Sequence, residues 1–195
     1  MTDITRLRRF VTGMTDLADR SDGDEDAMIA GTRDLLAELI AVDDWLPDDL
    51  AMEGETYRQY LLHCDPKQRF SAVSFVWGPG QTTPVHDHTV WGLIGVLRGA
   101  EIGQRFDFAP DGTPVAGTEE ILEVHDIDVV SPTRGDVHKV TNAFSDRASI
   151  SIHVYGANIG AVHRHVFDPA SGAAKDFVSG YTNSAVPNLW DLSKG

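Results

Sequence analysis

The segment GQTTPVHDHTVWG, residues 80–92, carries the pattern that decides the fold of this chain. Its two histidines, His86 and His88, are separated by one residue, and residues two apart on a β-strand point to the same face. Pro84 favours an extended backbone on the approach to them. Two imidazoles on one face can bind one metal ion if a facing strand supplies a third ligand. The segment therefore predicts a metal site built on β-structure.

His138 is the candidate for the third ligand. It lies in PTRGDVHKVTN, residues 132–142, where turn residues lead into an alternating run, and this predicts a turn that enters a strand. A barrel brings distant strands face to face, so His138 can meet the pair across the interior. A lone His-x-His pair is more often incidental than a ligand pair. Two glycine-framed histidine segments together favour metal binding.

Composition restricts the possible partners. The chain has 195 residues and a formal net charge of −14. It has no apolar run of the roughly 18 residues that a membrane span needs. An acidic surface repels phosphate backbones and anionic lipids, so nucleic-acid and membrane partners are not expected. Cys64 is the single cysteine, and the N-terminal segment lacks a secretory pattern. We expect a cytoplasmic protein whose oligomeric state the sequence does not indicate.

Hydrophobic periodicity divides the chain into a helical and a β-rich part. Apolar residues recur at helical spacing over residues 4–19 and 25–41. We expect residues 1–50 to form a helical extension that covers one face of a β-barrel or sandwich domain, residues 51–195. In that domain, short runs rich in β-formers alternate with turn sequences. The runs are residues 57–63, 69–77, 90–97, 100–108, 118–124, 146–156 and 164–168.

The first histidine segment resembles the first motif of the cupin superfamily, G-x5-H-x-H-x3-E-x6-G. The match runs from Gly80 through the two histidines to Gly99. It has one departure, because Gly92 stands where the motif has a glutamate ligand.

The second histidine segment resembles the second cupin motif, P-x-G-x2-H-x3-N. It matches from Gly135 through His138 to Asn142, with Pro132 one residue further from the glycine than the motif prescribes. The resemblance implies a mainly β fold, a cupin barrel of the double-stranded β-helix or jelly-roll type. The N-terminal helices are then expected to pack outside the barrel.

Three histidines without the glutamate are similar to the metal site of the thiol dioxygenases, the cysteine dioxygenase family, over about residues 57–164. The resemblance implies a non-haem Fe(II) enzyme with His86, His88 and His138 as ligands. Such an enzyme adds both atoms of O2 to the sulfur of a small thiol carboxylate and produces the sulfinic acid. Because the sulfur supplies all four electrons, no organic cofactor or external reductant is implied. The implied partners are the small thiol and O2.

The family's Ser-His-Tyr triad falls on Ser151, His153 and Tyr155. The run 147–155 alternates between apolar and polar residues, which by itself predicts the polar side in solvent. The resemblance reverses this prediction: the polar side lines the barrel interior, and the aliphatic side packs outward against another layer. The spacing permits a hydrogen-bonded chain from hydroxyl to imidazole to phenol.

Two further residues are candidates for substrate binding. Gln59 stands where animal cysteine dioxygenases have an arginine for the substrate carboxylate, and Arg164 matches a later pocket arginine of the bacterial 3-mercaptopropionate branch. The glutamine favours 3-mercaptopropionate over cysteine. The animal enzymes also carry a cysteine that crosslinks to the tyrosine. Gly92 occupies that position here, so no crosslink is expected.

Two other functions fit the same residues. A three-histidine site with an open position also suits a zinc or manganese hydrolase or isomerase. Cupins also serve as non-catalytic binding domains, here for a small acid, because a fold does not determine a function. Metal analysis and a test for turnover distinguish these alternatives from a dioxygenase.

Overall fold

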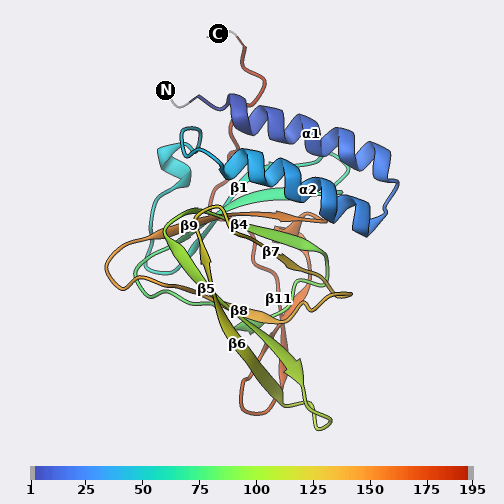
Figure 1. Cartoon of the computed structure of the whole chain (residues 1–195), viewed down its shortest axis with the longest axis vertical. Helices are drawn as coiled ribbons and strands as arrows, with labels where there is room; N and C mark the ends of the chain where they lie inside the picture. Colours follow the sequence, from blue (N-terminus) through green and yellow to red (C-terminus); the bar gives the residue numbers. More distant parts are fainter. Residues whose placement is uncertain (1–2, 193–195) are drawn as a thin grey trace.

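Two helices precede a barrel of two facing antiparallel sheets in the computed structural model, which describes residues 3–192 (Figure 1). The helices are α1, Thr5–Ser21, and α2, Glu25–Ile40, close to the predicted ranges. The Asp24 side chain caps α2 by accepting a hydrogen bond from the Ala27 backbone N–H. No helix in the described part has the length and hydropathy of a membrane span.

The helix-covered sheet has five strands and the opposite sheet has six. The order of the first is β1 (Arg58–Cys64), β2 (Ser71–Trp77), β9 (Ser149–Tyr155), β4 (Gly92–Arg98) and β7 (Ile127–Val130). The order of the second is β11 (Ala174–Phe177), β10 (Arg164–Phe167), β3 (Val85–His86), β8 (His138–Asn142), β5 (Ala100–Phe108) and β6 (Pro114–Glu123). Short 3-10 helices occupy Asp48–Leu50 and Ile159–Ala161.

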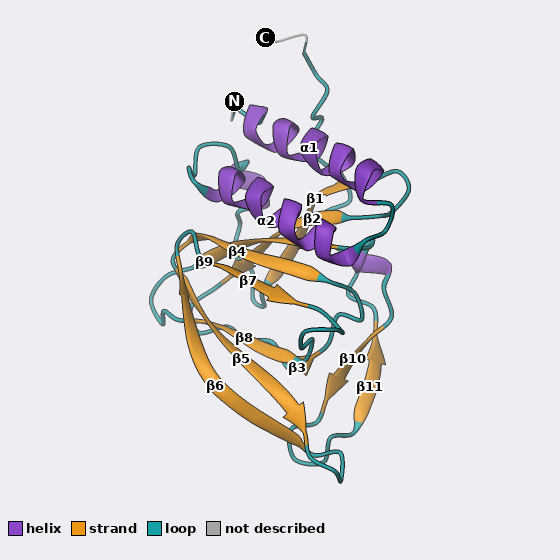
Figure 2. Ribbon diagram, turned by 45° about the vertical axis from the view of Figure 1, so that its right-hand side comes forward, coloured by secondary structure: helices purple, strands orange, loops and turns teal. Residues whose placement is uncertain are grey.

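The helices form a layer on the outer face of the helix-covered sheet (Figure 2). Apolar side chains of α1, α2, β2, β4 and β9 make one continuous buried cluster there. Close contact depends on Gly95 in β4, since a Cβ at this position would lie 2.9 Å from Ile40 Cδ1. Burial of this aliphatic layer is the main stabilising term that the fold offers.

The expected fold class, a mainly β cupin barrel with helices packed outside, is confirmed. Each predicted β-run overlaps an observed strand. Two strands were not predicted: β7 and β11, which have four residues each. The strand expected at His86 is present as β3, but it is only two residues long. Such short strands show too few alternations for a periodic pattern.

A C-terminal segment, residues 179–183, covers the free edge of β1; we call it the C-terminal strap. Gln59 exchanges two hydrogen bonds with Thr182: its N–H donates to Oγ1 at 3.0 Å, and its C=O accepts from the Thr182 N–H at 2.8 Å. Leu61 is bound in the same way by the side-chain amide of Asn183, at 2.7 and 3.0 Å. The outer backbone groups of Gln59 and Leu61 are thereby satisfied.

Candidate metal centre

The three predicted histidines converge inside the barrel. Their candidate ligand atoms all lie within 4.8 Å of one another, and each pair of rings has its centroids 4.9 Å apart. Two of them, His86 and His138, are direct cross-strand partners on β3 and β8. The group contains no carboxylate among the described residues.

The prediction that His86 and His88 lie on one strand is wrong, because β3 ends at His86. The chain turns after it, and Thr89 adopts a positive φ of 58°. His88 reaches the cluster from a loop whose position is fixed by hydrogen bonds. The alternation of side chains along a strand therefore does not explain how the two imidazoles come together.

Hydrogen bonds orient two of the three imidazoles. The Nδ1 of His86 lies 3.0 Å from the carbonyl oxygen of Pro84, and the Nδ1 of His88 lies 2.9 Å from Oδ1 of Asp136. Both partners are acceptors, so each Nδ1 carries the proton and donates. The Nε2 of each ring is left with a free lone pair, as metal ligation requires.

Two of the three histidines, His86 and His138, are held in the neutral form that ligates metals. Burial lowers the pKa of His86 to about 3, and the positive charge that His88 would carry acts in the same direction. Burial also holds the pKa of His138 well below 6.5. Three imidazole nitrogens fit a divalent transition metal, and without a carboxylate ligand the ion would keep its full positive charge.

Asp136 supports the centre and was not predicted. One of its carboxylate oxygens accepts from the backbone N–H groups of His88 and Thr89, at 3.0 and 2.8 Å, and the other accepts from the His88 ring. Burial raises the pKa of Asp136, but the His88 bonds outweigh it and bring this pKa below its ordinary value. In the sequence, Asp136 is marked only by its place between Gly135 and His138. In the structure Gly135 adopts a φ of 106°.

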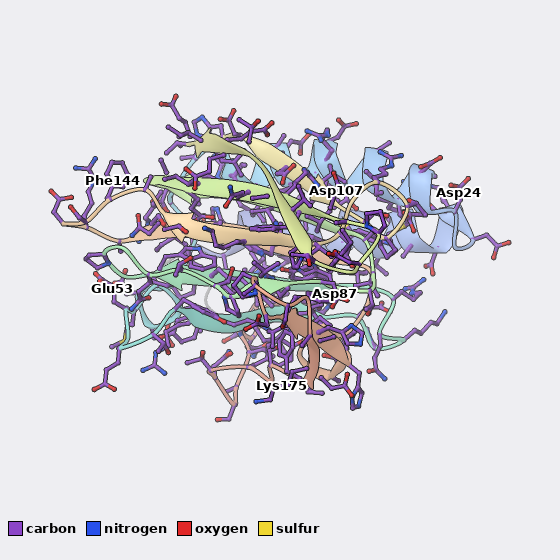
Figure 3. The ribbon with its side chains drawn as sticks, turned by 90° about the horizontal axis from the view of Figure 1, so that it is seen from below. Asp24, Glu53, Asp87, Asp107, Phe144 and Lys175 are labelled. Atoms are coloured by element: carbon purple, nitrogen blue, oxygen red, sulfur yellow. The ribbon has the colours of Figure 1, made fainter. Side chains whose placement is uncertain are left out.

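A second acidic residue, Asp87, ties the histidine loop to the neighbouring strand β10 of the six-stranded sheet. Asp87 accepts hydrogen bonds from the backbone N–H and the Nδ1 of His165, each at 2.7 Å, and its own N–H donates to the His165 carbonyl at 3.1 Å. In Figure 3 Asp87 lies near the centre of the view, whereas Asp24 and Glu53 lie toward opposite sides. The loop that carries His88 is thus anchored on β10.

Ser151, His153 and Tyr155 form a buried hydrogen-bonded chain on the inner face of β9. The Ser151 Oγ is 2.8 Å from the His153 Nε2, and the His153 Nδ1 is 2.8 Å from the Tyr155 hydroxyl. The Trp77 indole N–H donates to the Ser151 Oγ at 3.2 Å. At the other end, the Tyr155 ring stacks on His88, with centroids 5.2 Å apart. The hydrogen-bonded chain therefore runs inside the barrel from Ser151 to the histidine cluster.

The outer face of β9 is aliphatic, as expected from the alternation. Ile150, Ile152 and Val154 are buried in the cluster beneath the helices. The polar alternate residues are equally buried, so neither face of this strand contacts solvent.

Gly92 lies directly against Tyr155. The two residues are cross-strand partners on β4 and β9, and a Cβ on Gly92 would be 2.7 Å from Cδ1 of the Tyr155 ring. The absence of a side chain at this position gives the tyrosine ring its place.

Arg164 and Gln59 meet at the C-terminal strap. The buried Arg164 guanidinium donates through Nη2 to the Ser179 Oγ at 2.6 Å, while its Nε has no hydrogen-bond partner among the described residues. Gln59 donates through Nε2 to the Gly180 carbonyl at 3.1 Å and to Ser179 at 3.4 Å. Arg164 lies within electrostatic range of Tyr155. Ser179 was not predicted, because nothing in its local sequence marks it.

A cavity of about 210 Å³ beside His138 is lined mainly by residues of β5 and β6. Its wall includes Arg105 of β5, whose Nη2 donates to Asp128 of β7 at 2.5 Å. Arg105 thus joins β5 of one sheet to β7 of the other, although these two strands do not pair with each other.

The fold and the three-histidine cluster together define the class: a cupin with a candidate metal centre that lacks an acidic ligand. A family model for cysteine dioxygenase type I matches residues 50–168. The chain belongs to the cysteine dioxygenase type I family, which indicates a dioxygenase with a small-molecule substrate.

Solved structures match parts of this chain. A Klebsiella pneumoniae protein with a double-stranded β-helix domain is 18% identical; the match covers 61% of this chain and 95% of that one, with a TM-score of 0.47. The Cnp3 cupin domain of Schizosaccharomyces pombe is 13% identical, with coverage of 54% and 67% and a TM-score of 0.42. An oxalate oxidase in complex with glycolate is 15% identical, with coverage of 56% of each chain and a TM-score of 0.44.

Proposed function

We propose that this protein is an Fe(II) thiol dioxygenase that converts a small thiol carboxylate to its sulfinic acid, with 3-mercaptopropionate as the favoured substrate and cysteine next. The observation that carries the proposal is the buried trio His86, His88 and His138, with the ring of Tyr155 stacked on His88. Membership of the cysteine dioxygenase type I family supports the same reaction class.

Iron held by the three imidazoles would supply the redox chemistry that joins both atoms of O2 to the thiol sulfur. The reaction consumes a thiol and O2 and yields a sulfinate and one proton, so it needs no other reductant. A site without an acidic ligand favours an incoming anion, because the positive charge of the centre is not neutralised.

The protein's own groups position the substrate. Tyr155 is held by His153 and Ser151, so its hydroxyl has a fixed place beside His88. Burial raises the pKa of Tyr155, and the phenol therefore stays protonated and can hydrogen-bond to substrate at neutral pH. Aromatic residues that pack along this chain exclude water, since Phe75 stacks on His153 with centroids 4.3 Å apart.

Arg164 is the proposed carboxylate anchor. It is 4% exposed, and its unpartnered Nε is a buried donor that a carboxylate would satisfy. Gln59 shares the Ser179 contact and is proposed to shape the same pocket.

The surroundings favour a substrate without an amino group. The acidic residues of the two histidine segments are both engaged: Asp136 with His88, and Asp87 with His165. Neither is available to pair with a substrate ammonium. This arrangement supports 3-mercaptopropionate ahead of cysteine.

The test is O2 consumption by the Fe(II)-loaded protein with 3-mercaptopropionate, cysteine and cysteamine. We expect stoichiometric sulfinate formation and the highest kcat/KM with 3-mercaptopropionate. Cysteamine has no carboxylate for Arg164 and should be the poorest substrate. Protein that purifies with zinc and shows no thiol-dependent O2 uptake would instead support a hydrolase or a binding protein.

A matched pair of tyrosine variants tests the role of the phenol. Tyr155→Phe should retain iron but turn over about tenfold or more slowly, because it loses one positioned hydrogen bond. Tyr60→Phe is the control, since its hydroxyl bonds to the Met52 carbonyl in the helix-side cluster. Equal rates for the two variants would remove Tyr155 from the mechanism.

A further inference from the structure

A buried carboxyl group lies at the inner end of the Ser151–His153–Tyr155 chain. Glu101 of β5 is 0% exposed, and neither of its carboxyl oxygens has a hydrogen-bond partner of normal geometry among the described residues. The groups that face it are the hydroxyls of Ser151 and Ser149 and the indole of Trp77, which are close enough to influence its pKa. A buried, unpaired carboxylate is unfavourable unless it is neutralised.

The surroundings of Glu101 favour its neutral form. Burial raises the pKa of Glu101 to about 8, against the opposing effect of the neutral donors of Ser151, Ser149 and Trp77. Its cross-strand partner on β8 is Asn142, but that amide donates to the carbonyls of Trp77 and Gly78 instead.

We propose that Glu101 is the fourth member of the chain and sets the direction of its hydrogen bonds, so that Tyr155 presents its O–H to the substrate. Glu101 acts here as a positioning residue, because it acts through Ser151 and does not touch the metal ligands.

The direction follows from the bonding capacity of one hydroxyl. Ser151 has one O–H and two lone pairs, and the Trp77 N–H occupies one lone pair. A neutral Glu101 that donates to the second lone pair leaves Ser151 only one bond to make, as a donor to the Nε2 of His153. The Nδ1–H of His153 then donates to the oxygen of Tyr155, and the phenol O–H is free to donate into the site.

Ionisation of Glu101 reverses the three bonds that link Glu101, Ser151, His153 and Tyr155, while the Trp77 N–H still donates to Ser151. The Ser151 O–H then turns to the carboxylate, the Nε2 of His153 becomes the donor, and its Nδ1 accepts the Tyr155 proton. Tyr155 can then only accept hydrogen bonds from the site. Burial holds the pKa of His153 well below 6.5 and raises that of Tyr155, so Glu101 is the member of this chain that ionises nearest to neutral pH.

Infrared spectroscopy of the metal-free protein tests the protonation of Glu101 without any assay of turnover. The wild type should show the C=O band of a protonated buried carboxyl at about pH 6, and this band should disappear as the pH rises through about 8. Glu101→Gln should lack the band at both pH values. Glu119→Gln, in an exposed carboxyl on neighbouring β6, is the matched control and should retain it. No band at pH 6, or a band that survives in Glu101→Gln, would overturn the inference.

The pH profile of the iron-loaded enzyme tests the consequence for Tyr155, which rests on the proposed function. Wild-type kcat should fall at least about tenfold as Glu101 ionises, whereas Glu101→Gln, which stays neutral and can still donate, should lose this step. Glu101→Leu cannot donate and should be slow at every pH. A wild-type step that persists in Glu101→Gln would contradict the positioning role. If no thiol supports O2 uptake while the infrared band behaves as described, the dioxygenase proposal fails and the neutral state of Glu101 stands.

Discussion

The two faces of β9 are equally buried but chemically opposite. Its outer side chains, such as Ile152, are aliphatic and pack under the helices, whereas its inner side chains, such as His153, are polar and face the barrel interior. The outer face stabilises the fold by removing apolar surface from water. The inner face is stable only where each polar group has a partner. Stability and chemistry are thus assigned to opposite sides of the same backbone.

The largest effect should come from the inner side of the barrel. His138→Ala should abolish iron binding and thiol-dependent O2 uptake while the helix layer keeps the protein folded. Iron analysis, oxygen electrode measurements and circular dichroism test this. His125→Asn, in an exposed turn at a positive φ that asparagine tolerates, is the control and should bind iron normally. Iron-dependent activity in His138→Ala would refute the ligand set.

The next effect is a pH dependence of stability that originates on β5. The pKa of Glu101 is about 4.5 in the unfolded chain, and burial raises this pKa to about 8 in the folded protein. The contribution of the neutral carboxyl to the free energy of unfolding is therefore fully present below about pH 4.5. It is lost as the pH rises through about 8, at a cost of up to about 5 kcal/mol. Glu101→Gln should therefore gain stability relative to the wild type between these pH values. Urea denaturation of both proteins at several pH values measures the difference, and a constant difference would contradict it.

A smaller effect is expected from the outer face. Ile152→Ala should lower the free energy of unfolding by about 3 kcal/mol, because it leaves a cavity in the helix-side cluster. Its iron content and kcat should be close to those of the wild type, since the side chain points away from the site. Ile121→Ala on β6, where the side chain is 64% exposed, should cost less than about 0.5 kcal/mol. A catalytic defect without a stability loss in Ile152→Ala would break the distinction between the faces.

The smallest of the four effects concerns Asp136. Asp136→Asn keeps one acceptor oxygen but loses the charge that orients His88, so iron affinity should fall about 10- to 100-fold. Competition with a chromophoric chelator measures this affinity. Asp107→Asn, at an exposed position of β5, should leave it unchanged. Identical affinities for the two variants would show that the loop backbone alone orients His88.

The sequence predicted the barrel and the residues of the chain on β9, because both leave periodic or spaced patterns. Alternation placed Ser151, His153 and Tyr155 on one face, but it could not tell which face is inside when both are buried. The family resemblance supplied that choice. The roles of these residues and of the histidines stay predictions until they are tested.

What the sequence could not predict depends on contacts between distant segments. Asp136 and Asp87 act through loops, where spacing carries no periodic signal. Ser179 meets Arg164 only because the C-terminal strap returns to β1. The sequence gives little indication that Glu101 is buried. Alternation in the run 100–108 places it on one strand face with Gly103 and Arg105, and a charged residue on a strand is usually in solvent.

The C-terminal strap also has a consequence for solubility. An uncovered edge strand offers its backbone groups to any other chain and promotes edge-to-edge aggregation. Thr182 and Asn183 occupy those groups on β1. The same segment that holds Ser179 against Arg164 therefore keeps neighbouring molecules from adding a strand at this edge of β1.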